Sequence, residues 1–107
     1  MSEGDTALER ARINAETGRI GWLELQRFFA AGKVIYVAPE LDLVEVALVI
    51  SQDRAHALGE WTRTGRVMRV SDAQAREWVS ANALMWSVVV KPWVLVQPVL
   101  ADGDART

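Results

Sequence analysis

The feature that most constrains the fold is an apolar segment at residues 84–96. It is rich in valine, and in an extended conformation both of its faces would be apolar. This pattern predicts a central strand that is covered on both sides. Pro92 has no backbone N–H, so we expect a bulge or a strand break there. The apolar stretch continues to Leu100 but contains five interruptions: Ser87, Lys91, Pro92, Gln97 and Pro98. A transmembrane helix needs about 20 predominantly apolar residues, so we reject a membrane span.

Length and composition predict one domain. The chain has 107 residues, of which half are hydrophobic and five are Trp, and this is enough apolar material for one core. We place a single globular domain at residues 1–100 and a flexible tail at residues 101–107. The chain has no cysteine, so disulfides, thiol chemistry and Cys-based zinc sites are excluded.

The charge of the chain argues against a nucleic-acid binder. The formal net charge is −2 and the isoelectric point is near 5.3, whereas a nucleic-acid binder normally carries a basic face. The first residues are polar and acidic and lack the pattern of a secretory signal. We therefore expect neither a nucleic acid nor a membrane as partner.

Capping signals and periodicity predict four helices. Thr6 begins the first one, which ends near Gly18. The second spans about residues 22–31, and Gly32 follows it in a left-handed conformation. Asp53 caps the third, which ends near Gly65. The fourth begins at the capping-box pair Ser71 and Gln74.

Two further strands are predicted between the second and third helices. Residues 33–38 favour extended structure, and residues 43–50 alternate in a way that suggests the second arm of an antiparallel hairpin. A helix beginning at Asp42 is the alternative that this short apolar run leaves open. The order ααββααβ then predicts an α+β fold, with a small three-stranded, mainly antiparallel sheet covered by about four helices.

Most recognisable active sites are missing from the sequence. Gly18 and Gly21 lack the partners of a dinucleotide-binding loop, and no Walker-type lysine is present. His56 is the only histidine, and we interpret it as an exposed neighbour of Glu60 rather than as a base or a metal ligand. We assign no catalytic residue, no metal ligand and no cofactor.

Three other groups of residues, which are acidic, arginine and tryptophan side chains, each have a structural and a functional interpretation. Glu40, Asp42 and Glu45 are acidic enough for a hard cation, but turn and surface roles are favoured. The arginines at positions 63, 66 and 69 suggest a phosphate or single-strand contact, but a solvated loop is favoured. The five tryptophans favour core packing, with a binding surface as the alternative for some of them, because Trp is enriched at interface hot spots.

Three segments resemble a bacterial family of small proteins of unknown function, DUF2288. They are GWLELQRFFAAG at residues 21–32, LDLVEVA at residues 41–47 and VVVKPWVLVQ at residues 88–97. The resemblance implies a stand-alone bacterial cytoplasmic protein and carries no catalytic residues. It singles out a set of candidate binding residues: Glu24, Asp42, Glu45, Trp93 and Gln97. These residues either converge on one site or cap and bridge structural elements.

The excess of tryptophan without a catalytic set favours a binding or protein-interaction module. We expect a homo-oligomer or another protein as partner, through a sheet edge or a Trp-rich surface. The alternative is a small enzyme or metal-dependent site that uses Asp42, Glu45 and His56. A concave pocket that holds at least two of these groups is the observation that would favour this alternative.

Overall fold

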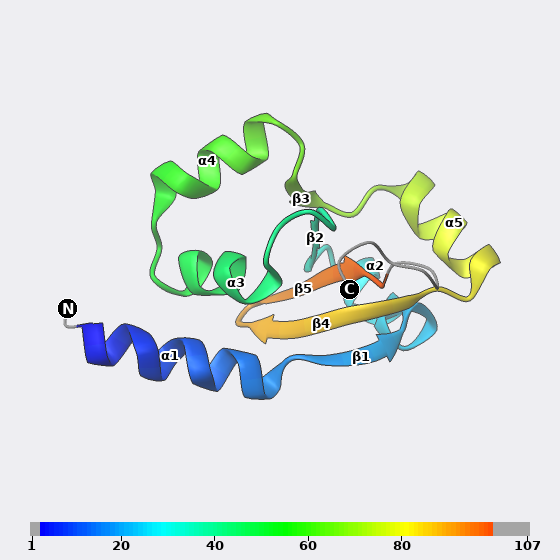
Figure 1. The fold of residues 1–107 in the computed structure, drawn as a ribbon. Helices are drawn as coiled ribbons and strands as arrows, with labels where there is room; N and C mark the ends of the chain where they lie inside the picture. Colours follow the sequence, from blue (N-terminus) through cyan, green and yellow to red (C-terminus); the bar gives the residue numbers. More distant parts are fainter. Residues whose placement is uncertain (1–2, 100–107) are drawn as a thin grey trace.

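The computed structural model describes residues 3–99 (Figure 1). Its helices are α1 (Glu3–Glu16), the 3-10 helix η1 (Trp22–Leu25), α2 (Gln26–Ala30), α3 (Leu43–Ser51), α4 (Ala55–Arg63) and α5 (Asp72–Ala81). Its strands are β1 (Gly18–Gly21), β2 (Val34–Val37), β3 (Val67–Arg69), β4 (Leu84–Val90) and β5 (Trp93–Pro98). The predicted tail at residues 101–107 lies outside the described residues. None of the helices in the described part of the chain has the length and apolar character needed to cross a membrane.

The five strands form one mixed sheet in the order β1-β4-β5-β2-β3. The pair β5 and β2 is parallel, and the other three pairings are antiparallel. The prediction of a three-stranded, mainly antiparallel sheet with four helices is therefore wrong. The described chain has five α-helices and five strands in a different order.

The largest error concerns residues 43–50, which form helix α3 instead of a strand. The Asp42 carboxylate caps this helix, because one of its oxygens accepts hydrogen bonds from the N–H groups of Val44 at 2.9 Å and Glu45 at 3.3 Å. Five of the nine residues of α3 are buried, so the helix is apolar nearly all round. A helix of this kind has the same hydrophobic pattern as a strand covered on both faces. The alternative of a helix from Asp42 is the correct one.

The segment at residues 84–96 forms two strands rather than one. The break predicted at Pro92 is present, as a turn in which β4 reverses into β5 around a cis Lys91–Pro92 peptide. The short edge strands β1 and β3 were missed. Each lies beside a longer strand that supplies its hydrogen bonds, and this support is invisible in a local pattern.

Several of the predicted helix ends are correct, and two are wrong. Ser71 and Gln74 form the predicted capping box at α5, and Gly32 has the expected left-handed conformation with φ of +74°. Asp53, however, does not cap α4: its φ is +56°, and Arg54 is the N-cap residue. Helix α1 begins at Glu3 instead of Thr6.

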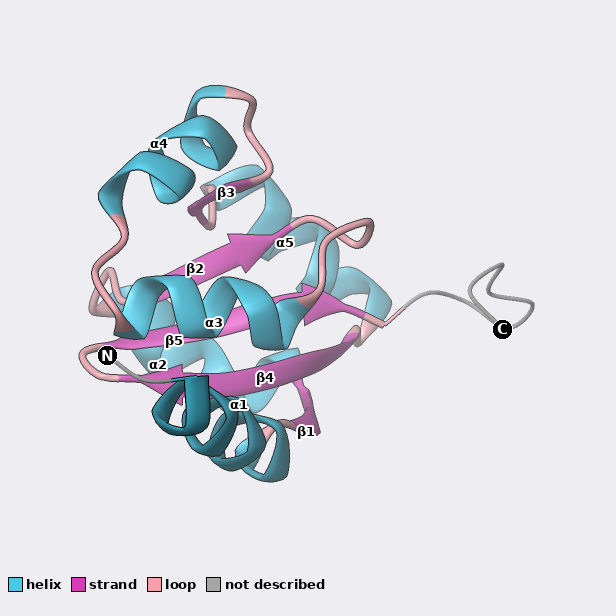
Figure 2. Cartoon of the chain, turned by 60° about the vertical axis from the view of Figure 1, so that its left-hand side comes forward, coloured by secondary structure: helices cyan, strands magenta, loops and turns pink. Residues whose placement is uncertain are grey.

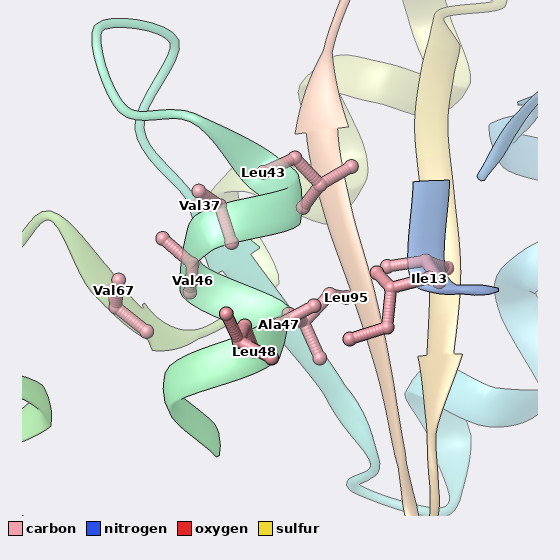
Figure 3. Close-up of a cluster of buried hydrophobic side chains, with 9 residues drawn as sticks. Ile13, Val37, Leu43, Val46, Ala47, Leu48, Val67 and Leu95 are labelled. Atoms are coloured by element: carbon pink, nitrogen blue, oxygen red, sulfur yellow. The ribbon is translucent and has the colours of Figure 1, made fainter. Parts of the chain in front are cut away.

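The sheet is covered on both faces, and each face has its own core (Figure 2). Helices α1, α3 and α4 pack on one face, where the side chains of α3 lie over Leu95 with Ile13 of α1 beside them (Figure 3). Helices η1, α2 and α5 pack on the other face around Trp22 and Trp78, whose rings meet edge to face at 4.9 Å. This arrangement leaves an opening where α1 ends and α3 begins.

Candidate binding site

An open cavity of about 480 Å³ lies where the end of α1, the β2–α3 connection and strands β4 and β5 meet. We call it the Trp86 cavity. Its polar and aromatic lining residues are Asn14, Thr17, Glu40, Asp42, Trp86 and Gln97. Its apolar lining consists of Pro39, Leu41, Leu43 and Val44. This volume lies within the range typical of small-ligand pockets.

Strand pairing places one wall of the Trp86 cavity. Trp86 on β4 lies directly opposite Gln97 on β5 and opposite Arg19 on β1. Residues paired in this way project from the same face of a sheet, so the three side chains form a row. The Arg19 guanidinium lies 5.5 Å from the centre of the Trp86 ring, which is a cation–π distance.

Gln97 connects this row to the opposite rim of the cavity. Its side chain is only 4% exposed. Its Nε2 donates hydrogen bonds to the carbonyl oxygens of Ala38 at 2.9 Å and Leu41 at 2.7 Å. The amide thus holds the β2–α3 connection, more than fifty residues away in the chain, against strand β5.

The rim of the cavity is acidic. Glu40 and Asp42 are its two charged lining residues, and no Lys or Arg lines it. Glu40 forms an ion pair with Arg66, whose Nε lies 3.6 Å from a carboxylate oxygen of Glu40. Asp42 uses one oxygen for the helix cap. The cavity therefore presents acceptors and negative charge around an aromatic wall.

A second opening extends this cavity along α1. It measures about 400 Å³ and shares Asn14, Asp42 and Val44 with the first. Ala7, Arg10 and Ala11 of α1 complete its lining. Together the two openings form a groove between α1 and the start of α3.

Of the five candidate binding residues, the structure brings Asp42 and Gln97 together in this cavity. The Glu45 carboxylate instead pairs with Arg10 at 2.7 Å and with Arg54 at 3.8 Å. Glu24 is exposed in η1, on the helix layer of the opposite face.

Trp93 lies at the other end of the sheet face, at the start of β5. It packs against the first core and has the Arg69 guanidinium 5.5 Å from its ring centre. In the sequence, Glu40 was considered only as part of the acidic cluster with Asp42 and Glu45, and Trp86 only as one of the five tryptophans. Asn14 carried no signal at all.

The groups proposed for a metal-dependent site do not assemble. Within residues 3–99 no group of three or more His, Asp or Glu side chains is placed to hold a metal ion. His56 is exposed in the first turn of α4. Asp42 and Glu45 stand one turn apart on α3, each engaged as described above.

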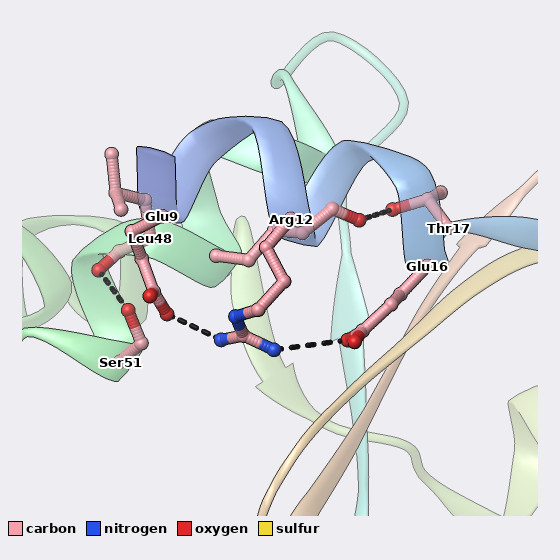
Figure 4. A network of polar contacts seen from close by, with 7 residues as sticks. Glu9, Arg12, Glu16, Thr17, Leu48 and Ser51 are labelled. Carbon is pink, nitrogen blue, oxygen red and sulfur yellow. Dashed lines mark hydrogen bonds and ion pairs between the residues drawn. The ribbon is translucent and has the colours of Figure 1, made fainter. Parts of the chain in front are cut away.

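The arginine cluster and the surface of α1 are occupied by local ion pairs. Arg63 pairs with Glu60 at 2.9 Å, and Arg66 and Arg69 have the partners given above. On α1, Arg12 bridges Glu9 and Glu16 (Figure 4). The hydrogen bond and charge of Glu9, with a smaller contribution from Glu16, raise the pKa of Arg12. Exposed pairs of this kind contribute little to stability.

Comparisons with known proteins point to one family. The family model described as "Protein of unknown function (DUF2288)" matches residues 9–98. The chain is also similar to the NMR solution structure of PA1075 from Pseudomonas aeruginosa, with 34% sequence identity, a TM-score of 0.78 and coverage of 94% of both chains. No curated protein matches the chain significantly. The resemblance seen in the sequence is confirmed, and neither description names an activity or a ligand.

Proposed function

We propose that this chain, which belongs to the DUF2288 family of proteins of unknown function, is a protein-interaction module. We propose that its binding site is the Trp86 cavity. The observation that supports this proposal is the convergence of an indole from β4, a buried amide from β5 and two carboxylates from the β2–α3 connection. Concave sites with an apolar lining and a few placed polar groups are the usual form of a binding site.

A binding role suits these residues better than catalysis does. The cavity lining contains no His, Lys or Arg, so its only titratable groups are the carboxylates of Glu40 and Asp42. One oxygen of Asp42 is already committed to the α3 cap. The indole of Trp86, by contrast, is the residue type most enriched at interface hot spots.

Self-association is one form of this proposal. Strands β1 and β3 end the sheet on either side, and edge strands carry backbone groups available for pairing with another chain. Sedimentation velocity over a hundredfold range of protein concentration tests this form directly. A dimer that weakens when Trp86 is replaced by Phe would place the contact at the cavity.

The decisive test is affinity capture from lysate of the source organism with matched variants. Trp86→Phe changes the cavity, whereas Trp93→Phe changes an equally stacked, half-buried indole outside it. We expect a partner that is retained by the wild type and by Trp93→Phe and is lost with Trp86→Phe. Capture that is unchanged by Trp86→Phe would refute the site. Far-ultraviolet circular dichroism of both variants checks that each one folds.

A further inference from the structure

Strand β1 ends one side of the sheet, and none of the described strands pairs with its outer side. The N–H of Trp22, just after β1, donates to the carbonyl of Ala83 at 2.8 Å. Opposite residues of an antiparallel pair alternate between pairs that exchange hydrogen bonds and pairs that do not. The backbone groups of Ile20 therefore face β4, whereas the N–H and C=O groups of Arg19 and Gly21 point away from it.

This edge has few of the features that keep edge strands from pairing with another chain, which are proline, bulges and free charges. Strand β1 has no proline, its four residues pair with β4 without a bulge, and two of them are glycine. A Cβ placed on Gly18 or Gly21 would meet nothing within 4 Å. The charged group of Arg19 lies over the Trp86 ring, 5.5 Å from its centre. The edge is therefore open to a partner.

Exposed apolar side chains gather around the same edge. Of the six large apolar side chains that are exposed in the described chain, four lie on the elements next to β1: Leu8 on α1, Leu23 on η1, and Leu84 and Val89 on β4. A standard protein interface uses roughly 20 to 30 residues on each side, so a four-residue strand needs further contacts. These side chains offer them to a folded partner rather than to an isolated extended peptide.

A second copy of the chain fits this edge in one two-fold register. Opposite residues of two paired strands project from the same face, so a two-fold axis must pass through a residue of β1. An axis at Gly18 or Gly21 would leave only that one residue of β1 opposite another strand residue. An axis at Arg19 would set two like charges opposite each other, which is destabilising. An axis at Ile20 sets two isoleucines together and Arg19 opposite Gly21, which has no side chain.

We propose that β1 pairs in this register with β1 of a second copy and joins the two five-stranded sheets into one. This inference rests on the self-association form of the proposed function and names its surface. Arg19 and Gly21 are the residues whose backbone groups point outward, so the register matches them. Gly21 is also the N-cap of η1, and its carbonyl serves that helix. The pairing therefore depends on two bonds, each from a Gly21 N–H to the Arg19 carbonyl of the other copy.

The same two-fold axis brings exposed apolar side chains together. Because paired strands run in opposite directions, η1 of one copy lies beside the start of β1 of the other. Val89 is at this end as well, on β4 beyond the residue that pairs with Gly18. Its neighbour Val88 packs in the first core, so Val89 projects from the opposite face, on which η1 lies. Leu23 of one copy and Val89 of the other therefore share one end and one face of the joined sheet.

The substitution Gly21→Pro removes the N–H that this pairing uses and leaves the hydrogen bonds of the monomer in place. Gly21 has φ of −73° and ψ of 144°, which proline adopts, and the preceding Ile20 is extended in β1, as proline requires. Gly21→Ala is the matched control, because it keeps the N–H and its Cβ has room. Far-ultraviolet circular dichroism and urea denaturation check that both variants fold.

Sedimentation velocity of the full chain over a hundredfold range of concentration measures the dimer. We expect the wild type and Gly21→Ala to dimerise equally, and Gly21→Pro to dimerise about thirtyfold more weakly, the net value of two hydrogen bonds. Amide hydrogen exchange gives a second readout. The N–H of Gly21 should become protected as the wild-type concentration rises, whereas the N–H of Arg69 on the opposite edge strand β3 should not.

The remaining outcomes separate this inference from the proposed function. A wild type that stays monomeric, or a Gly21→Pro variant that dimerises as tightly as Gly21→Ala, would overturn the inference. If Trp86→Phe weakens the dimer and Gly21→Pro does not, the contact lies at the cavity, so the inference is wrong and the proposed function stands. If the wild type is monomeric and Gly21→Pro loses a captured protein, the edge binds a strand of another protein and not a second copy. The proposed function fails only when capture is also insensitive to Trp86→Phe.

Discussion

The substitution Gln97→Met tests whether one buried amide holds the β2–α3 connection in place. Met has nearly the same length and volume as Gln but cannot donate a hydrogen bond. The variant removes the two bonds from Nε2 to Ala38 and Leu41 while the space between β5 and the connection stays filled. Its effect on stability therefore reports these bonds rather than a cavity.

The expected magnitude follows from the two acceptors. The carbonyl of Ala38 also accepts a hydrogen bond from the N–H of Leu41 at 3.0 Å, so losing Gln97 there costs the net value of one bond, about 1 kcal/mol. The carbonyl of Leu41 loses the shorter bond, of 2.7 Å, and lies in a half-buried residue, for which about 1 to 2 kcal/mol is expected. The total is about 2 to 3 kcal/mol.

Urea denaturation followed by tryptophan fluorescence measures this loss. For a chain of 107 residues, each kcal/mol corresponds to about 4 °C in melting temperature, so Gln97→Met should melt about 8 to 12 °C lower. Gln26→Met is the matched control, because Gln26 is exposed at the start of α2 and should change stability by less than about 0.5 kcal/mol. A loss below about 0.5 kcal/mol for Gln97→Met would refute the reasoning.

Three further substitutions test the local elements around the site. Asp42→Ala removes both cap bonds of α3 and should lower the free energy of unfolding, measured by urea denaturation, by about 1 kcal/mol. Asp42→Asn should lower it by only a few tenths of a kcal/mol. Equal losses for the two variants would contradict the capping role of Asp42. Ser71→Ala breaks the capping box of α5 and should likewise cost about 1 kcal/mol, measured the same way. Burial, with a smaller contribution from Glu40, raises the pKa of Tyr36. Folding thus favours the neutral phenol, and this stabilisation is complete below the unfolded pKa of about 10 and is lost as pH rises through the folded value. Stability measured from pH 9 upward should fall less steeply for Tyr36→Phe than for the wild type.

The elements predicted correctly are those whose signals are local. The capping box at Ser71 and the left-handed Gly32 depend on contacts within a few residues, and both are present. Helix α3 was missed because its burial is decided by distant elements: α1, α4 and the sheet surround it, so most of its residues are apolar. Periodicity then carries little information, and the decisive signal was the cap at Asp42.

The site was predictable only in part, because its residues come together through contacts between distant parts of the chain. Asp42 and Gln97 were selected through the family resemblance, and both line the cavity. Trp86 enters it through its pairing across the sheet with Gln97, a register that was not predicted. Asn14 enters from α1, far away in the chain. A site made where a helix end, a connection and two strands meet depends on topology, which short sequence patterns do not specify.

The cavity also depends on residues 43–50 forming a helix rather than a strand. If residues 43–50 continued as a hairpin strand, Asp42 would lie in a tight turn beside β2. As a helix, α3 crosses the sheet face, and its connection to β2 spans from Ala38 to Asp42 over the end of β5, where Gln97 holds it. The same amide thus positions the acidic rim through Nε2, and Gln97 also lines the cavity. Substitutions of Gln97 will therefore change stability and binding together, so the binding proposal must be judged from Trp86 and the rim charges, whose replacement leaves this connection in place.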